Sequence, residues 1–372
     1  MRIAIDGRAL LGERTGIGTY TLAIAEGLSG LPGLSVGLFA PRAFPDSLDG
    51  SRRFSVHSDR HPFGIVWLQT SLPQRIAAWG ADVLVSALTI APARGQIPFV
   101  SVVHDLTPLT HPEWHARRTL IGFVPLWERT LERAARFLCV SDTTARDLVS
   151  RYPEAASRTR VAHNGVDLVF FSRKDDPAAR QRTRQRYAAG QPFLLYLGTL
   201  EPRKNVEALV VACERLWGRR RARPDLVLAG GAGWKTAGLH RRIARSPFRD
   251  KIHVAGYATR EAARELYRAA EVFVYPSLAE GFGLPVLEAM AVGLPVVAST
   301  ADALREVGGD AAIYAPPRDV EALSRQIERA LEDEPVRTRL AEAGPARAAR
   351  FTWAAAVEAT AKVIGEAVGE NP

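Results

Sequence analysis

This chain of 372 residues has little cysteine, methionine or lysine. Its two cysteines, Cys139 and Cys213, stand in apolar runs, which favours buried thiols over a disulfide or metal site and agrees with a reducing cytoplasm. No run of 18 or more apolar residues occurs, so no segment is predicted to span a membrane. The sequence enters a predicted strand at Arg2–Asp6 without an apolar leader, so secretion is not expected.

Metal-binding patterns are also missing. No Asp-x-Asp triplet occurs anywhere in the chain, and the eight histidines lack the spacing of metal ligands. We therefore expect no metal ion and no other cofactor. If the protein handles a diphosphate, arginine, lysine or a helix N-terminus must then neutralise its charge.

Basic residues outnumber acidic ones, 49 against 40, which gives a formal net charge of +9. Arginines cluster in residues 180–186, 219–223 and 241–245. The clusters are either solvated surface or a region that attracts anionic lipid headgroups or a phosphorylated substrate. Nucleic-acid binding is disfavoured because the basic runs lack interleaved aromatic residues and no known nucleic-acid-binding motif occurs.

Short apolar runs alternate with helical patterns along the chain, which predicts parallel sheets covered by helices on both faces. A chain of this length is expected to form two domains. A polar segment over residues 168–190 separates two such series, so we predict domains over residues 1–168 and 169–350. Residues 351–372 are predicted to contain a helix that packs back across both domains. The predicted class is α/β, with two tandem Rossmann-like, doubly wound domains facing each other across a cleft.

The predicted strands are the apolar runs that end at polar or glycine residues. They lie at Arg2–Asp6, Leu34–Ala40, Ala81–Ser86, Phe99–Val103, Arg136–Val140, Val161–His163, Phe193–Gly198, Asp225–Ala229, Lys251–Ala255, Val272–Tyr275, Pro295–Ala298 and Ala312–Tyr314. Helices are predicted between them, among them Thr19–Ser29, Asn205–Trp217 and Trp353–Val368. In such sheets, ligands bind beyond the carboxyl ends of the strands.

The most informative stretch is residues 280–288, where Glu280 and Glu288 stand eight positions apart around Gly-Phe-Gly-Leu-Pro. A predicted strand precedes it, and a helix is predicted to begin at Pro285, since proline suits the first helical position. Backbone N–H groups at a helix N-terminus suit an anion such as a phosphate. Glu280 is placed to hold ligand hydroxyls. Glu288, predicted in the first helical turn, either complements the helix dipole or binds ligand.

Two other loops of the second half close predicted strands. Arg203 and Lys204 follow the strand that ends at Gly198, and they are either solvated cations or a pair that binds a diphosphate. Gly256 and Tyr257 follow another strand, where the backbone either pairs with a nucleobase edge or forms a plain turn.

The first half carries two candidate ligand contacts. Gly16 and Gly18 fall in a predicted glycine loop over residues 12–18, which is either a tight turn or a loop whose amides approach a phosphate or sugar hydroxyl. His104 and Asp105 come directly after a predicted strand, at its carboxyl end. This placement favours hydrogen bonding to a substrate over a purely structural role.

Together these residues resemble the family 4 retaining glycosyltransferases of the GT-B fold, over nearly the whole chain. The most specific element is the Glu280-x7-Glu288 motif with its internal Gly-Phe-Gly-Leu-Pro. One departure is Thr199, where many relatives carry Arg after the strand-end glycine. The supporting motifs, in the same order as in the family, are Gly16 with Gly18, His104-Asp105, His163-Asn-Gly-Val-Asp167 and Arg203-Lys204-Asn205.

The resemblance implies a role for each candidate residue. Glu280 and His104 would contact the transferred sugar, and Glu288 the ribose hydroxyls. Arg203 and Lys204 would hold the diphosphate, with Arg203 standing in for the missing Arg at position 199. The catalytic set is thus His104, Arg203, Lys204 and Glu280, and the donor-binding set is Gly16, Gly18, Gly256, Tyr257, Phe282, Gly283, Leu284 and Glu288.

The implied activity is metal-independent, retaining transfer of a hexose from a nucleotide-sugar to a glycan or lipid-linked acceptor. The Gly-Ile-Gly-Thr-Tyr20 and His104-Asp-Leu-Thr-Pro108 stretches look most like the mannosyl- and rhamnosyl-transferring branch that builds bacterial surface polysaccharides, which favours GDP-mannose. UDP-glucose, UDP-GlcNAc and dTDP-rhamnose are alternative donors. Other classes left open are a GT-B epimerase or phosphorylase and a non-catalytic nucleotide-sugar-binding scaffold. A dehydrogenase is also left open, because Gly16 and Gly18 match half of the glycine motif that binds dinucleotides, with Thr21 at the third glycine position.

The segment Trp114–Phe137 combines apolar residues with arginines in a helical pattern. It is either a core helix or a peripheral contact with an anionic membrane at the inner face of the cell membrane, where lipid-linked acceptors lie. The expected location is therefore the cytoplasm, with membrane contact as the alternative.

Overall fold

A computed structural model describes residues 1–45, 53–172, 176–219 and 224–369 of the chain. The chain divides into two compact units, one formed by Met1–Gly165 with Trp353–Pro372, and the other by Val166–Thr352. Each unit is built around one sheet in which every pairing is parallel. Part of the arginine cluster at 219–223 lies outside the described residues.

The first unit contains a seven-stranded sheet in the order β3-β2-β1-β4-β5-β6-β7. Its strands are β1 Arg2–Asp6, β2 Ser35–Ala40, β3 Ser55–Ser58, β4 Val83–Ser86, β5 Phe99–Val103, β6 Arg136–Cys139 and β7 Thr159–Val161. Its helices are η1 Gly7–Leu10, α1 Gly16–Ser29, α2 Gly64–Trp79, α3 Thr107–Thr110, η3 Pro112–Trp114, α4 Arg117–Arg133, α5 Asp142–Arg151, η4 Pro153–Arg158 and α14 Trp353–Val368.

The second unit contains a six-stranded sheet in the order β10-β9-β8-β11-β12-β13. Its strands are β8 Phe193–Leu197, β9 Asp225–Ala229, β10 Ile252–Gly256, β11 Val272–Tyr275, β12 Val296–Ser299 and β13 Ile313–Ala315. Its helices are α6 Pro177–Ala188, η5 Pro202–Lys204, α7 Val206–Arg219, α8 Ala237–Ala244, η6 Arg249–Lys251, α9 Arg260–Ala269, α10 Leu284–Ala291, α11 Asp302–Gly308, η7 Gly309–Ala311, α12 Val320–Glu332 and α13 Glu334–Ala348.

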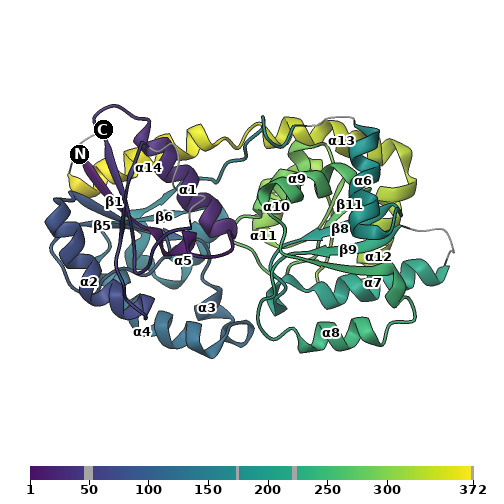
Figure 1. The fold of residues 1–372 in the computed structure, drawn as a ribbon, viewed down its shortest axis with the longest axis horizontal. Coiled ribbons are helices and arrows are strands. Elements are labelled where there is room, and N and C mark those ends of the chain that lie inside the picture. Colours follow the sequence, from purple (N-terminus) through teal and green to yellow (C-terminus); the bar gives the residue numbers. More distant parts are fainter. Residues whose placement is uncertain (46–52, 173–175, 220–223, 370–372) are drawn as a thin grey trace. The chain divides into compact units, whose positions relative to one another are not determined.

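Helices lie on both sides of each sheet, so the central strands are buried on both faces (Figure 1). In the second unit, α12 packs beside α7 and α7 beside α8, while α10 packs beside α11 and α13. The strands are rich in Val, Leu, Ile and Phe without polar alternation, as expected for parallel strands of a sheet that helices cover on both faces. The predicted α/β class with two doubly wound sheets is therefore confirmed.

Most predicted strands lie within two residues of the observed ones, and Phe99–Val103 is identical to β5. The strand predicted at Val161–His163 lies two residues earlier, as β7. The exposed edge strand β3 was not predicted, because it is short and polar. Cys139 and Cys213 are buried free thiols, as predicted.

Two helix predictions had wrong bounds. The predicted loop over residues 12–18 ends early, because α1 begins at Gly16 and so includes both Gly16 and Gly18. The helical stretch predicted at Trp114–Phe137 contains three elements: Trp114 ends η3, α4 covers Arg117–Arg133, and Phe137 belongs to β6. Among the described residues, no helix is both long and apolar enough to cross a bilayer.

Helix α14 packs against α1 and strands β4, β5 and β6 of the first unit, and α1 and α14 lie side by side in Figure 1. Gly27 makes this approach possible, since a Cβ atom there would lie 2.2 Å from Cγ2 of Val357. Near the end of α14, Glu366 pairs with Arg136 at 3.1 Å and with Arg160 at 3.0 Å, and so ties the helix to the edge of the sheet.

We predict that Gly27→Ala destabilises the protein by about 1–3 kcal/mol, because the β-branched Val357 cannot turn away from the added methyl group. Gly218→Ala is the matched control, since Gly218 is also helical and nothing lies within 4 Å of its Cβ position. Urea unfolding of both variants checks this. Val357→Ala should restore stability to the Gly27 variant, and equal stability of the two glycine variants would contradict the close packing.

Candidate functional site

The strand order of the second sheet creates the site. Strand β8 lies between β9 and β11, so the loops that follow β8 and β11 are neighbours at the carboxyl edge of the sheet. The chain order reverses between these two strands, and this is where ligands bind in doubly wound sheets. The loop after β8 carries Arg203 and Lys204, and the loop after β11 carries Glu280. A backbone hydrogen bond from the Leu278 N–H to the Arg203 carbonyl, 2.8 Å long, joins the two loops.

Glu280 is held between the two cations. Nη1 of Arg203 donates to Oε2 of Glu280 at 2.9 Å, and Nζ of Lys204 donates to Oε1 at 2.7 Å. The Glu280 side chain is only 7% exposed, and those of Arg203 and Lys204 are 13% and 10% exposed. Three residues that the sequence analysis assigned to one site thus form one buried ion-pair cluster.

Two more residues complete this cluster. Glu201 accepts a hydrogen bond from Nη2 of Arg203 at 2.8 Å, and its side chain is 5% exposed. The Tyr275 hydroxyl accepts from Nζ of Lys204 at 2.7 Å. The cluster Glu201, Arg203, Lys204 and Glu280 therefore contains two carboxylates and two cations, and its formal charges cancel.

Electrostatics keep Glu280 ionised. Burial opposes its charge, but Arg203 and Lys204 outweigh burial and lower the pKa of Glu280 to about 2. Burial lowers the pKa of Lys204 from its ordinary value, and the negative charge of Glu280 opposes that change. Removing one partner of a buried ion pair typically costs about 3–5 kcal/mol, because the other charge stays buried without compensation.

Asn205 fixes the loop that presents the cations. Its φ is 57°, in the left-handed region where Asn is better tolerated than most residues. Its Nδ2 donates to the carbonyls of Pro276 at 3.1 Å and Pro317 at 2.7 Å. The loop after β8 is thereby tied to the ends of β11 and β13.

The Gly-Phe-Gly-Leu-Pro turn leads into α10. Gly283 is the N-cap with φ of 109°, and a Cβ atom there would lie 2.6 Å from Leu304, so this position requires glycine. Phe282 is buried and meets the ring of Phe351 edge-on at 5.7 Å. The helix begins at Leu284, one residue before the predicted start, which makes Pro285 the second helical residue.

The predicted position of Glu288 in the first turn was wrong, because it is the fifth residue of α10 and the first turn holds no acidic residue. Glu288 therefore does not complement the dipole at the N-terminus of α10. Glu288 instead accepts a hydrogen bond from the Tyr267 hydroxyl at 3.0 Å. Burial raises the pKa of Glu288 to about 7, although this hydrogen bond and the charge of Arg260 act in the opposite direction.

Gly256 ends strand β10 with φ of 71°, and its carbonyl accepts from the Gly230 N–H at 2.7 Å. Tyr257 follows it and is 38% exposed. Gly230 comes directly after β9, and its Cβ position would lie 2.0 Å from the Gly198 carbonyl oxygen. Glycine is therefore required where the loops after β8, β9 and β10 meet.

In the first unit, Gly16 and Gly18 occupy the first turn of α1 rather than a loop. Gly16 is exposed, whereas Gly18 is buried, and a Cβ atom on Gly18 would lie 2.7 Å from the carbonyl oxygen of Ala9. Close packing of α1 on η1 thus explains Gly18 without any ligand. The pattern alone could not distinguish this contact from a ligand loop, because both need a residue without a side chain.

His104 lies at the carboxyl end of β5, as predicted. Its Nε2 is 2.9 Å from the Ala87 carbonyl, and its ring meets Tyr20 of α1 edge-on at 5.1 Å. Burial lowers the pKa of His104, against the effects of the Ala87 carbonyl and Asp105, so the ring is neutral and Nε2 donates. Asp105 accepts from the Thr107 N–H at 2.9 Å and so shapes the turn into α3.

The predicted site residues thus form two groups, one in each unit. The first unit contains Gly16, Gly18 and His104, and the second contains the other nine. Sequence reasoning missed Glu201, Tyr267 and Tyr275 as contacts. Glu201 stands in the same loop as Arg203, which is a usable signal, whereas nothing local marks the two buried tyrosines.

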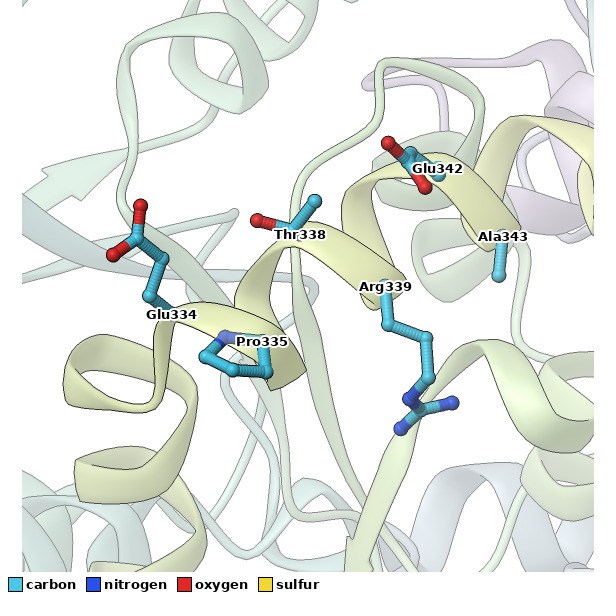
Figure 2. A pocket seen from close by; sticks show the side chains of 6 residues that line it. All are labelled: Glu334, Pro335, Thr338, Arg339, Glu342 and Ala343. Atoms are coloured by element: carbon cyan, nitrogen blue, oxygen red, sulfur yellow. The ribbon is translucent and has the colours of Figure 1, made fainter.

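A separate hollow lies along one side of α13 (Figure 2). Its lining belongs to this one helix and includes none of the predicted site residues. We assign it no function. The residues are Glu334, Pro335, Thr338, Arg339, Glu342 and Ala343.

Two protein-family models match the chain. The model described as "Glycosyl transferases group 1" matches residues 179–347, and "Glycosyltransferase Family 4" matches residues 14–170. These matches confirm the predicted family. Solved structures of similar fold are glycosyltransferases of the GT-B type, which confirms the predicted fold.

Individual proteins extend the similarity. The chain is 36% identical over 255 residues to O-antigen chain mannosyltransferase B of Escherichia coli, a match that covers 68% of this chain and 66% of that protein. It is 27% identical to the MMP alpha-(1->4)-mannosyltransferase of Mycolicibacterium hassiacum, over 99% of this chain and 98% of that protein. A structure of Anabaena Alr3699/HepE in complex with UDP-glucose has a TM-score of 0.77 at 20% identity, and covers 97% and 98% of the two chains. The chain thus spans slightly less than two thirds of the length of the E. coli relative.

We predict that Glu288 makes stability depend on pH. The ordinary pKa of 4.5 applies to the unfolded chain, and the folded pKa is about 7. Between pH 4.5 and 7, the folded state therefore retains a proton that the unfolded state has lost. The stabilisation from this group is complete below pH 4.5 and is lost as pH rises through 7. Relative to Glu288→Gln, the wild-type free energy of unfolding should fall by up to about 3 kcal/mol between pH 4.5 and 8.

Urea unfolding of both proteins at a series of pH values measures this difference. The Gln variant keeps the side-chain shape and cannot titrate, so it serves as the reference. Parallel stability profiles for the two proteins would contradict a protonated Glu288 in the folded state.

Proposed function

Since this chain belongs to the group 1 and family 4 glycosyltransferases of the GT-B fold, we propose that it transfers mannose from GDP-mannose to a glycan or lipid-linked acceptor, with retention of anomeric configuration. The observation that carries this proposal is the buried cluster of Glu280, Arg203 and Lys204 at the switch point of the second sheet. Buried charges are costly to maintain, and strongly perturbed groups at such an edge favour a functional site.

The donor would bind to the second unit. Glu280 would accept hydrogen bonds from hydroxyls of the sugar, and Glu288 would contact the hydroxyls of the ribose. The cations of the cluster would neutralise the diphosphate, together with amides at the start of α10. In full, the residues of the proposed donor site there are Arg203, Lys204, Gly256, Tyr257, Glu280, Phe282, Gly283, Leu284 and Glu288.

The first unit would contribute contacts to the transferred sugar and the acceptor. His104 is a hydrogen-bonding group at a strand end, and its neutral state suits a hydroxyl partner. Gly16 lies exposed in the first turn of α1 and would line the junction between donor and acceptor. Gly18 would act only indirectly, because its position is explained by packing on Ala9.

The proposed chemistry is a front-face substitution. The bond between the sugar C1 and the diphosphate oxygen breaks, the bond from C1 to the acceptor oxygen forms on the same face, and the acceptor proton passes to the leaving phosphate. The protein supplies orientation and preorganised positive charge for the leaving group. We propose that neither a metal ion nor any other cofactor takes part.

Mannose is favoured because the two relatives named above are mannosyltransferases. Other donors, UDP-glucose, UDP-GlcNAc and dTDP-rhamnose, would fit the same cluster, since it recognises the diphosphate and sugar hydroxyls common to all of them. A non-catalytic scaffold is less well supported, because a protein that only binds would not need a cluster with this desolvation cost.

We propose in addition that the first unit contacts an anionic membrane. The side chains of Phe63, Ile65 and Val66 at the start of α2 are 67%, 36% and 47% exposed, and Ile121 and Val124 of α4 are 76% and 42% exposed. We call these five residues the apolar patch. Ile65 lies against Gly122, whose Cβ position is 3.2 Å from it, so the two helices form one surface.

Charge beside the apolar patch favours a lipid surface. Arg117 and Arg118 are exposed one turn before Ile121, on the same side of α4. No acidic residue occurs in the first turn of α4, so two positive side chains face the positive end of the helix dipole. Anionic headgroups would relieve this repulsion, while the apolar patch enters the headgroup boundary.

A donor panel tests the activity. We expect wild-type protein to transfer sugar from GDP-mannose to a mannosylated acceptor faster than from UDP-glucose, UDP-GlcNAc or dTDP-rhamnose, measured by release of the nucleotide. Activity should persist in EDTA, because the cluster cations would neutralise the leaving group. Preference for another donor would refute mannose as the transferred sugar and leave the proposed transfer reaction intact. Loss in EDTA with recovery in Mg²⁺ would overturn the metal-free mechanism.

Vesicle flotation tests the membrane contact. Wild-type protein should bind vesicles that contain phosphatidylglycerol and not pure phosphatidylcholine. Replacing Arg117 and Arg118 with Gln should weaken binding roughly 30-fold, at about 1 kcal/mol for each charge. Ile121→Asp should also weaken it, whereas Val169→Asp, at an 87% exposed valine of the second unit, is the matched control. Equal binding of the Ile121 and Val169 variants would exclude the apolar patch.

A further inference from the structure

We infer that the two adjacent cations of the site have different tasks: Arg203, anchored by Glu201, positions Glu280, and only Lys204 of the two contacts the donor diphosphate. This inference rests on the proposed function and refines it. It reassigns Arg203, for which the family resemblance implied a contact with the diphosphate in place of the missing Arg at position 199, and it adds Glu201 as a positioning residue.

The guanidinium of Arg203 is already committed. Its Nη1 donates to both the Ala279 carbonyl and Oε2 of Glu280, at 2.9 Å each. Its Nη2 donates to Oε1 of Glu201 at 2.8 Å. Two buried carboxylates thus share this cation, and turning it toward a phosphate would leave both without it.

The side chain of Glu201 pairs with Arg203 and has no capping role. Glu201 is the N-cap residue of η5, yet its side chain makes no capping hydrogen bond and pairs with Arg203 two residues later. Pro202 between them restricts the backbone of the turn. The Glu201 side chain is 5% exposed, so its carboxylate is poorly available to solvent or ligand.

Lys204 retains donor capacity. Its ammonium group has three hydrogens, and two contacts are present, to Tyr275 and to Oε1 of Glu280. Within the described part of the chain, the third hydrogen meets no acceptor. A flexible ammonium can also exchange partners at a lower cost than a guanidinium held at three points.

The two oxygens of Glu280 explain why the tasks are divided. Arg203 holds Oε2 and Lys204 holds Oε1. When Lys204 shares its charge with a diphosphate, Arg203 still compensates the buried carboxylate and keeps it ionised and oriented toward the sugar. Without that fixed partner, donor binding would leave a buried carboxylate poorly compensated.

Comparing GDP affinity with turnover separates the two tasks, because GDP carries the diphosphate and lacks the sugar. We expect Lys204→Gln to weaken GDP binding about 30-fold in calorimetric titration, as for a lost charge-assisted hydrogen bond. Arg203→Gln should change the Kd of GDP less than about threefold but lower kcat with GDP-mannose roughly 100-fold, because Glu280 loses its orientation.

The acid side of the pH profile gives a second readout. The charge of Arg203, together with that of Lys204, lowers the pKa of Glu280. In Arg203→Gln, the acid limb of the kcat/KM profile should therefore shift to higher pH. A change in folding alone would not produce this shift.

Variants at position 201 test the anchor. Glu201→Leu removes the acceptor and should behave like Arg203→Gln, whereas Glu201→Gln keeps an oxygen for Arg203 and should lose about tenfold less turnover than the Leu variant. Arg215→Gln, at an exposed pair with Glu321 in the same unit, should leave GDP affinity and turnover unchanged. Melting temperatures identify any variant that fails to fold, and Glu201→Gln tests the anchor if Glu201→Leu does not fold.

Equal losses of GDP affinity in the Arg203 and Lys204 variants, with wild-type protein active, would overturn the division of tasks alone. Full turnover in a folded Glu201→Leu variant would overturn the anchor. Wild-type protein that binds neither GDP nor UDP and transfers no sugar would instead defeat the proposed function and this inference together. If only UDP binds, UDP replaces GDP as the probe and the same comparison decides.

Discussion

The ion pairs that hold Glu280 between Arg203 and Lys204 are the contact on which the site depends. They join two loops separated by more than 70 residues in sequence, at the point where the chain order of the second sheet reverses. A buried carboxylate is tolerated there only because two cations compensate it. The positions of both loops, and the ionised state of Glu280, follow from that electrostatic constraint.

The remaining site features position backbone or adjust charge around this contact. Asn205 adopts a left-handed conformation and ties the cationic loop to the ends of two neighbouring strands. Gly283 permits the turn into α10, so that the helix begins beside Glu280. One turn further on, Glu288 is paired with a tyrosine rather than a cation, and burial raises its pKa. The two glutamates of one motif thus have pKa values shifted in opposite directions, because Glu280 is held in ion pairs with Arg203 and Lys204, whereas burial dominates at Glu288.

The candidate residues of the two units make different kinds of contact. In the second unit, three of the candidate ligand groups, Arg203, Lys204 and Glu280, form a charged network with Glu201. In the first unit, Gly18 is explained by the approach of α1 to Ala9, and His104 by hydrogen bonding to Ala87 and contact with Tyr20. The membership of the family rests on both halves, since one family model matches each of them. The proposed donor and acceptor rest on the second unit and on the mannosyltransferase relatives.

The sequence alone determined the local elements: apolar runs became parallel strands, and the motif residues fell at strand ends, because periodicity and glycine or proline punctuation act over a few residues. Tertiary structure decided which strand ends meet, and so brought Arg203 to Glu280 and Lys204 to Tyr275. It also decided that Glu288 lies in the second turn beside Tyr267, and that Gly16 and Gly18 belong to a helix. These outcomes depend on strand order and side-chain packing between distant segments, which no local pattern records.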